Sequence, residues 1–189
     1  MKVRWGVIGA AGIADRRTLP GLMLAKNAEL VAVMEVNQEL AEKIRAKYNA
    51  KKAYVSAEEL LKDKDVDAVY IASPVSYHKT VAEQAIALGK PLLIEKPITM
   101  SSGDGDKIVE LCREKGILAA TGFMMRYHPY HQKMREIVQS GKLGQVVSCR
   151  AQLTCWYPDM PGNWRQQKVT SGGGSLMDMG VHCIDLLQQ

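Results

Sequence analysis

The sequence lacks the features that mark several classes of protein. No apolar run approaches the roughly 20 residues of a membrane-spanning helix, and a tryptophan and glycines interrupt the N-terminal segment MKVRWGVIGA before a signal-like apolar core forms. The four cysteines are spread singly, with no CxxC pair and no histidine at zinc-finger spacing, so we expect no metal site. Free thiols in a reducing compartment are the simplest interpretation, and they favour a cytoplasmic location.

Long runs of one charge are also absent. The formal net charge is +5, but Lys and Arg are interspersed with Asp and Glu. A solvated surface with a mild cationic bias is therefore favoured over a nucleic-acid-binding face. Hydrophobic residues make up 47% and charged residues 24% of the 189 residues, which excludes disordered and fibrous architectures. The length suits one domain and part of a second.

The first 120 or so residues alternate short apolar runs with amphipathic stretches of helical period, which is typical of consecutive βαβ units. The near-continuous apolarity of the runs suits parallel strands covered by helices on both faces. Asn37 is a candidate cap for a helix, Ser56 and Glu59 form a capping-box pattern, and Gly89 and Gly116 lie where helices should end. Strands are expected at residues 3–8, 30–34, 66–72, 91–94 and 117–121.

The pattern changes after Gly122. We expect a helix at 129–139, a break at 141–144 and a strand in the β-prone stretch 145–155. A loop rich in Pro, Gly and Asn at 158–174 then leads to a last helix at 175–188. The sequence therefore predicts an α/β fold with a doubly wound parallel sheet of the Rossmann type at 1–121, and part of a second domain at 122–189.

A loop of small residues follows the first expected strand. In dinucleotide-binding folds such a loop brings the backbone close to a pyrophosphate at the N-terminus of a helix. Against the pattern G-x-G-x-x-G/A, Gly9 and Ala14 match, whereas Ala11 replaces the central glycine. Taken alone, the loop favours a dinucleotide site and an ordinary strand-to-helix turn about equally. The candidate cofactor-binding residues here are Gly9, Ala10, Ala11, Gly12, Ile13 and Ala14.

Glu35 directly follows the second expected strand, at its tip, where a carboxylate can bind the ribose hydroxyls of adenosine. A carboxylate would repel a 2′-phosphate, and the next two residues provide no arginine, so NAD is preferred over NADP. The alternative is a solvated glutamate at the end of a strand. Arg16 and Arg17 could lie near the pyrophosphate, although an exposed helical turn explains them as well.

Polar residues also mark later parts of the chain. The segments ASPVSYH at 72–78 and EKP at 95–97 follow apolar strands, and open α/β sheets bind ligands at the carboxyl ends of their strands. In the last helix, Asp178 and His182 are four residues apart and share one face, which Asp185 extends. The alternatives are a capping box of Ser175 with Asp178, and a buried structural histidine.

Several motifs occur in a fixed order: GVIGAAGIA, ASPVSYH, EKP, GFMMRYHP, SGKLGQVVS, GNWR and GGGSLMDMGVHCIDLL. This series resembles the family of glucose-fructose oxidoreductase and inositol dehydrogenase (Gfo/Idh/MocA). The resemblance implies a Rossmann domain followed by an α/β domain with an open-faced sheet, of which this chain holds the beginning. It also implies hydride transfer between nicotinamide and a hydroxyl-bearing carbon of a sugar, cyclic polyol or related compound, and a homo-oligomer. The alternative is a non-catalytic NAD-binding regulatory or interaction protein.

The resemblance assigns roles to the matching positions. Lys96 is expected to contact the nicotinamide and the substrate hydroxyl, where an ammonium stabilises alkoxide character. His182 is expected to act as general acid or base, with Asp178 orienting it. Trp164 and Arg165 match a pair that contacts the cofactor in some relatives, although an anchoring tryptophan and a surface arginine are about as favoured. The remaining expected contacts are Ser73, Pro74, His78, Glu95 and, near the cleft, Arg126.

Overall fold

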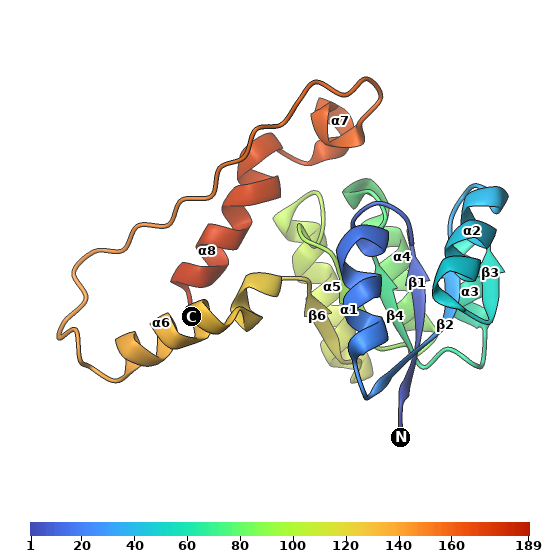
Figure 1. The fold of residues 1–189 in the computed structure, drawn as a ribbon, viewed down its shortest axis with the longest axis horizontal. Helices are drawn as coiled ribbons and strands as arrows, with labels where there is room; N and C mark the ends of the chain where they lie inside the picture. Colours follow the sequence, from blue (N-terminus) through green and yellow to red (C-terminus); the bar gives the residue numbers. More distant parts are fainter. The chain divides into compact units, whose positions relative to one another are not determined.

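The computed structural model describes residues 1–189, apart from the side chain of Lys168, and contains two compact units, Met1–Thr121 and Gly122–Gln189. The first unit is built on six parallel strands in the order β3-β2-β1-β4-β5-β6 (Figure 1). This is the strand order of doubly wound dinucleotide-binding folds. The strands are β1 (Val3–Ile8), β2 (Ala28–Met34), β3 (Lys52–Tyr54), β4 (Ala68–Ile71), β5 (Leu92–Ile94) and β6 (Ala119–Thr121).

Local signals explain where some of the connecting helices begin and end. The Asn37 side chain accepts a hydrogen bond from the Leu40 N–H at 2.9 Å, and Gly116 ends a helix with a φ of 64°. Both predictions are confirmed. Ser56 occupies the N-cap position, but its side chain makes no capping hydrogen bond in the described structure, so the predicted capping box is wrong. The helices are η1 (Ala14–Thr18, a π-helix), α1 (Leu19–Leu24), α2 (Gln38–Tyr48), α3 (Ala57–Lys62), α4 (Val75–Ala87) and α5 (Ser102–Lys115).

The side chains of the strands alternate between two core clusters. Val7 packs with Leu19 of α1 and Ile44 of α2, whereas its neighbour Ile8 belongs to the cluster formed with α3, α4 and α5. Consecutive side chains of a strand point to opposite faces of the sheet. Helices therefore cover both faces, and the predicted doubly wound parallel sheet is confirmed.

The strand β3 was not among the expected strands. It has only three residues, all half-buried, and it pairs with β2 at one edge of the sheet. A short edge strand of sequence KAY carries no apolar run, so its position depends on pairing with β2 rather than on its own sequence.

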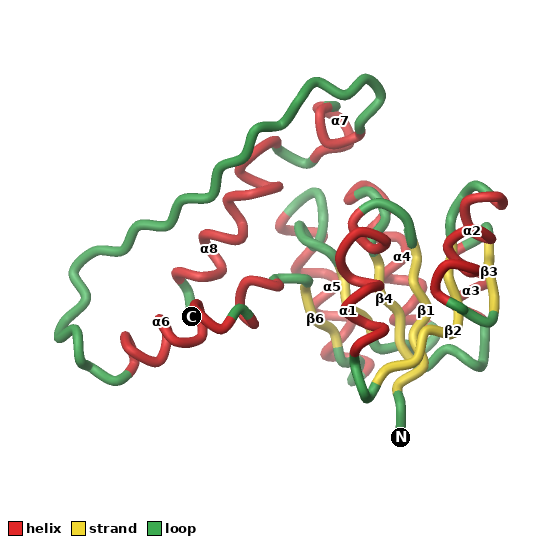
Figure 2. Tube along the Cα trace, viewed as in Figure 1, coloured by secondary structure: helices red, strands yellow, loops and turns green.

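The second unit begins with η2 (Met124–Tyr127) and α6 (Pro129–Gln139), and the predicted helix at 129–139 is confirmed. The expected strand at 145–155 is wrong, because the structure contains neither helix nor strand there (Figure 2). A strand needs a neighbouring backbone for its hydrogen bonds, and the described part of this unit contains no other strand. Val147 is accordingly 92% exposed.

The rest of the second unit consists of short helices. The predicted last helix forms, but its first part is a π-helix, η4 (Leu176–Gly180), which continues into α8 (Val181–Leu187). Before it come η3 (Trp164–Gln166) and α7 (Lys168–Ser171). Among all the helices that the structure describes, none has the length and apolar character needed to cross a membrane.

Arg4 and Asp67 form an ion pair that should make the first unit sensitive to acid. The guanidinium donates to both carboxylate oxygens, at 3.0 and 2.7 Å. These hydrogen bonds lower the pKa of Asp67 from its usual 3.8 to about 2. Because the folded pKa lies below the unfolded one, the pair stabilises the fold above about pH 4 and progressively less as the pH falls to about 2.

We therefore expect the urea midpoint of the unsubstituted chain to fall more steeply between about pH 4 and pH 2 than that of Asp67→Asn. Asp106→Asn removes one exposed carboxylate from α5 and serves as the control. The urea midpoint of this control should fall as steeply between about pH 4 and pH 2 as that of the unsubstituted chain. Equal slopes for the unsubstituted chain and Asp67→Asn would contradict the assignment.

Candidate functional site

The loop after β1 crosses the carboxyl ends of β2 and β4 at very close range. The N–H groups of Gly9 and Ala10 donate to the Met34 carbonyl at 3.0 and 3.1 Å. Gly9 has a φ of +76°, and a Cβ on it would lie 2.7 Å from the Ser73 nitrogen and 2.8 Å from the Ala72 carbonyl carbon. Gly9 is therefore required both by its backbone conformation and by contact with backbone atoms of the next loop.

Glu35 lies directly against this loop. Its Oε1 accepts a hydrogen bond from the Ala11 N–H at 2.6 Å. Ala14, which is fully buried, then opens the helical segment formed by η1 and α1. The first N–H groups of a helix have no intrahelical acceptor, and they favour an anion at that end. The structure thus places a carboxylate beside a loop that leads into a helix N-terminus.

The segment at 73–78 contributes a polar atom and a buried ring. The Ser73 hydroxyl is buried and has no hydrogen-bond partner among the described residues, and Pro74 caps α4. His78 is 1% exposed, with Nδ1 2.9 Å from the Pro97 carbonyl oxygen and Nε2 2.8 Å from that of Ser73. Burial lowers the pKa of His78. This histidine joins two loops beneath the surface, and its ring nitrogens do not face solvent.

The predicted residues of the EKP motif follow β5. Glu95 Oε1 accepts a hydrogen bond from the Tyr70 hydroxyl at 2.5 Å, and Oε2 accepts one from the Lys96 N–H at 3.2 Å. The Lys96–Pro97 peptide bond is cis. The sequence interpretation missed Tyr70. The signal was a single hydroxyl within the apolar strand AVYI, since a buried tyrosine usually finds a hydrogen-bond partner.

These residues fit a dinucleotide. The loop at 9–14, called the glycine loop below, allows close approach of a pyrophosphate. Glu35 supplies a carboxylate at the tip of β2, and the buried Ser73 hydroxyl can still donate and accept hydrogen bonds. Ala11 stands in place of the central glycine, and its contact with Glu35 is made by its backbone N–H, which any residue other than proline would supply.

In the second unit, Asp178 lies in the π-helix η4, one turn before His182 at the start of α8. Single π turns within helices are frequent at functional sites. Arg165 Nε is 3.7 Å from Asp178 Oδ1, and its guanidinium lies 4.3 Å from the Trp164 ring centroid. The structure therefore brings Asp178 next to the pair of Trp164 and Arg165, from which the sequence interpretation had treated it separately.

His182 is 3% exposed, and the Phe123 ring packs against it edge-on, with 6.0 Å between the ring centroids. Close to it in the helix, the Asp185 side chain is 4% exposed. Arg126 donates to this carboxylate from Nε, at 2.8 and 2.9 Å, and also from its terminal nitrogen. Arg126 was expected near the cleft, and the structure shows that it anchors η2 to α8.

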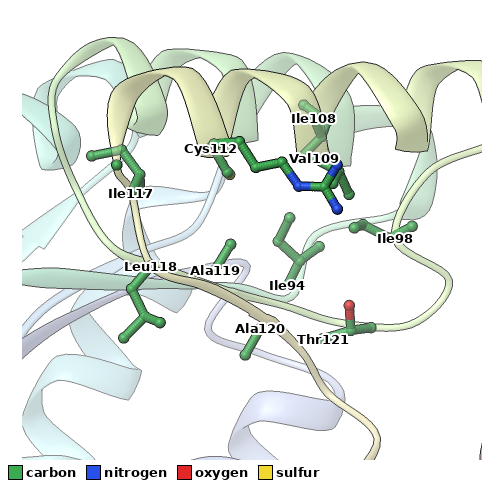
Figure 3. Close-up of a pocket in the computed structure, with 12 residues that line it drawn as sticks. Ile94, Ile98, Ile108, Val109, Cys112, Ile117, Leu118, Ala119, Ala120 and Thr121 are labelled. Atoms are coloured by element: carbon green, nitrogen blue, oxygen red, sulfur yellow. The ribbon is translucent and has the colours of Figure 1, made fainter.

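An apolar pocket of about 560 Å³ lies elsewhere in the first unit, between α5 and the strands β5 and β6 (Figure 3). Its lining includes Ile94, Ile108 and Cys112, and Arg113 is its only charged residue. Neither the glycine loop nor Glu35 contributes to it. A sugar or a pyrophosphate needs several polar partners, so this pocket is not the candidate site.

The strand order and the glycine loop define the first unit as an NAD(P)-binding Rossmann domain. Comparison with protein families agrees. A model described as "Oxidoreductase family, NAD-binding Rossmann fold" matches residues 3–123, and the model of the GFO/IDH/MocA C-terminal domain matches residues 131–189. The chain belongs to the Gfo/Idh/MocA family of oxidoreductases, as the motif series indicated.

Individual relatives are similar over nearly the whole chain. The 1,5-anhydro-D-fructose reductase of Ensifer adhaerens is 33% identical over 98% of this chain and 55% of its own length. The crystal structure of KijD10, a 3-ketoreductase from Actinomadura kijaniata in complex with NADP and TDP-benzene, is 29% identical with a TM-score of 0.83, covering 97% of this chain and 56% of that one. An NAD binding oxidoreductase from Klebsiella pneumoniae is 28% identical with a TM-score of 0.82, covering 100% of this chain and 52% of that one. The chain thus spans about half the length of the relatives it matches.

Proposed function

We propose that this chain is part of an NAD-dependent oxidoreductase that transfers a hydride between nicotinamide and a hydroxyl-bearing carbon of a sugar, cyclic polyol or related compound. The observation that carries the proposal is the contact between Glu35 and the Ala11 N–H at the carboxyl edge of a doubly wound sheet. The names of relatives support the substrate class, since they include a 1,5-anhydro-D-fructose reductase and a trans-1,2-dihydrobenzene-1,2-diol dehydrogenase.

The preference for NAD comes from the charge of Glu35. A carboxylate that lies against the glycine loop can accept hydrogen bonds from the ribose hydroxyls of adenosine, and it repels a 2′-phosphate. The backbone of the loop and the Ser73 hydroxyl would hold the rest of the dinucleotide. The proposed cofactor-binding residues are Gly9, Ala10, Ala11, Gly12, Ile13, Ala14, Glu35, Ser73, Pro74, Glu95, Lys96, Trp164 and Arg165. His78, which the sequence analysis also expected among the cofactor contacts, would support this set from below through the carbonyls of Ser73 and Pro97.

The proposed catalytic residues are Lys96, Asp178 and His182. The ammonium of Lys96 would hydrogen-bond the reacting oxygen and stabilise its alkoxide character. His182 would give or take the proton of that oxygen, and Asp178 would orient and tune the imidazole. When bound, nicotinamide supplies or accepts the hydride. The position of Asp178, one turn before His182, supports this tuning role.

The cofactor preference can be tested by fluorescence titration of the purified chain with NADH and NADPH. We expect NADH to bind at least about tenfold more tightly, because NADPH brings a phosphate against the Glu35 carboxylate. Glu35→Ser should reduce this ratio, because it removes an acceptor for the ribose hydroxyls of NADH and also the charge that repels the 2′-phosphate of NADPH. The control Glu39→Ser removes an exposed carboxylate in the first turn of α2 and should leave the ratio unchanged. Tighter binding of NADPH than of NADH would contradict the preference.

Turnover can be tested with 1,5-anhydro-D-fructose and NADH, by following the absorbance of the reduced nicotinamide. Oxidation of NADH that depends on the sugar, and that Lys96→Ala abolishes without abolishing NADH binding, would support hydride transfer. The same assay should be run on a panel of cyclic polyols with NAD⁺. NADH binding without turnover of any of these compounds would favour a non-catalytic dinucleotide-binding protein instead.

A further inference from the structure

Two buried side chains lie beneath the EKP motif in the first unit. Tyr70 and His78 are each 1% exposed, so neither faces solvent. Both end in polar atoms, which in a buried position need hydrogen-bond partners. Their partners lie in the segments that carry the candidate site residues.

Tyr70 connects the helical segment after the glycine loop to the backbone of Lys96. The hydroxyls of Thr18 and Tyr70 are 3.0 Å apart, and the Tyr70 hydroxyl donates to Glu95 Oε1 at 2.5 Å. Because Tyr70 gives its one proton to Glu95, Thr18 is the donor in the first contact. The other Glu95 oxygen accepts the Lys96 N–H at 3.2 Å. The chain of hydrogen bonds therefore runs from η1 to Lys96, and each bond polarises the next.

His78 holds the following residue of the same motif. Its ring nitrogens lie within 2.9 Å of the Pro97 carbonyl oxygen and 2.8 Å of the Ser73 carbonyl oxygen. A neutral imidazole has one N–H and donates to only one of these oxygens at a time. In either tautomer, the ring fills the space between the two loops and bonds one of them. The Tyr70 hydroxyl thus bonds Glu95, and His78 bonds Pro97 in the tautomer that carries the proton on Nδ1, so each neighbour of Lys96 has a buried side chain as a partner.

We infer that Tyr70 and His78 are positioning residues that fix the backbone of Lys96 from beneath the carboxyl edge of the sheet. The inference rests on the proposed function for the reason why Lys96 must be placed accurately. A group that stabilises a reacting oxygen has to be held to within about 0.5 Å of its productive position. The hydrogen bond of Tyr70 to the Glu95 carboxylate and the contact of His78 with the Pro97 carbonyl supply such support, whereas β5 has only three residues and ends before the motif.

The Tyr70 contact can be tested by hydrogen exchange, measured by mass spectrometry on peptides covering 95–99 in the cofactor-free chain. Tyr70→Phe keeps the ring and removes the hydroxyl, so it should fold and should speed exchange of the Lys96 amide about tenfold. Tyr54→Phe is the matched control. Tyr54 lies on the edge strand β3, and its hydroxyl also donates to a carboxylate, that of Asp63, at 3.0 Å. This variant should leave this exchange rate within about twofold. An unchanged rate in Tyr70→Phe, or an equal increase in both variants, would overturn the role of Tyr70.

The His78 contact is tested by two substitutions in the same experiment. His78→Leu removes both ring nitrogens and should speed exchange in the 95–99 peptides. His78→Gln keeps a side-chain N–H that can reach a carbonyl oxygen, so it should restore part of the protection. A purely space-filling role predicts the opposite order, with leucine protecting as well as glutamine or better. That result would overturn the role of His78.

A kinetic measurement separates this inference from the proposed function. With 1,5-anhydro-D-fructose and NADH, Tyr70→Phe should lower kcat about tenfold and leave the Kd of NADH within about threefold, because the Tyr70 hydroxyl bonds Glu95 next to Lys96, and its other partner, Thr18, lies beyond the loop at 9–14. If the unsubstituted chain binds no NADH, the proposed function fails while the exchange result still decides the positioning role. If exchange is unchanged while NADH binds, only the positioning role fails.

Discussion

Gly9→Ala should lower the free energy of unfolding by about 3 kcal/mol and weaken NADH binding at least about 100-fold. The φ of Gly9 is +76°, which already strains any residue with a Cβ. The added Cβ would also lie 2.7 Å from the Ser73 nitrogen and 2.9 Å from the Ala72 carbonyl oxygen. Both are backbone atoms at the end of β4, so the glycine loop has to move away from Ser73. Urea unfolding and fluorescence titration with NADH measure the two effects.

Gly12→Ala is the matched control in the same loop. Its φ of +61° is similar, but a Cβ there meets no atom within 4 Å. We expect a cost of only about 1 kcal/mol, from backbone strain alone. The difference in the free energy of unfolding between the two variants measures the cost of the close contact between Gly9 and the backbone of Ala72 and Ser73. Equal losses of stability in both variants would show that this contact has no energetic importance.

Arg126→Met should destabilise the second unit by about 3 kcal/mol, because it leaves the Asp185 carboxylate buried without its cation. The Asp185 side chain is 4% exposed, and Arg126 donates to both of its oxygens. The same pair ties η2 to α8, and thereby places the Phe123 ring against His182. Hydrogen exchange of peptides from α8 reports this loss directly.

Two further variants test whether the destabilisation by Arg126→Met comes from the unpaired charge of Asp185. Lys133→Met breaks the exposed pair of Lys133 with Glu136 on α6 and should change the stability by less than about 0.5 kcal/mol. Adding Asp185→Leu to Arg126→Met removes the unpaired charge and should recover much of the loss. If the double variant is no more stable than Arg126→Met, the cost comes from lost packing and not from a buried charge.

Sequence reasoning located most of the elements because their signals are local. An asparagine that caps a helix and a glycine that ends one act within a few residues, and both were identified correctly. The prediction of a strand at 145–155 was wrong because strand formation also depends on contacts that are not local. The residues of this stretch favour β structure, but a strand forms only against a neighbouring backbone, and the described part of the second unit supplies none. The edge strand β3 shows the reverse case, since pairing with β2 creates a strand that its sequence does not indicate.

The sequence by itself determined the fold class and the family. The period of apolar residues specifies strands and helices, and the ordered motifs carry the family relationship without any knowledge of contacts. Only the tertiary structure decided which polar groups meet. The Glu35 carboxylate and the Ala11 N–H are 24 residues apart in the chain, Tyr70 and Glu95 are 25 apart, and Arg126 and Asp185 are 59 apart. Such pairs depend on the order of the strands and on which face a side chain occupies, and no local pattern encodes either one.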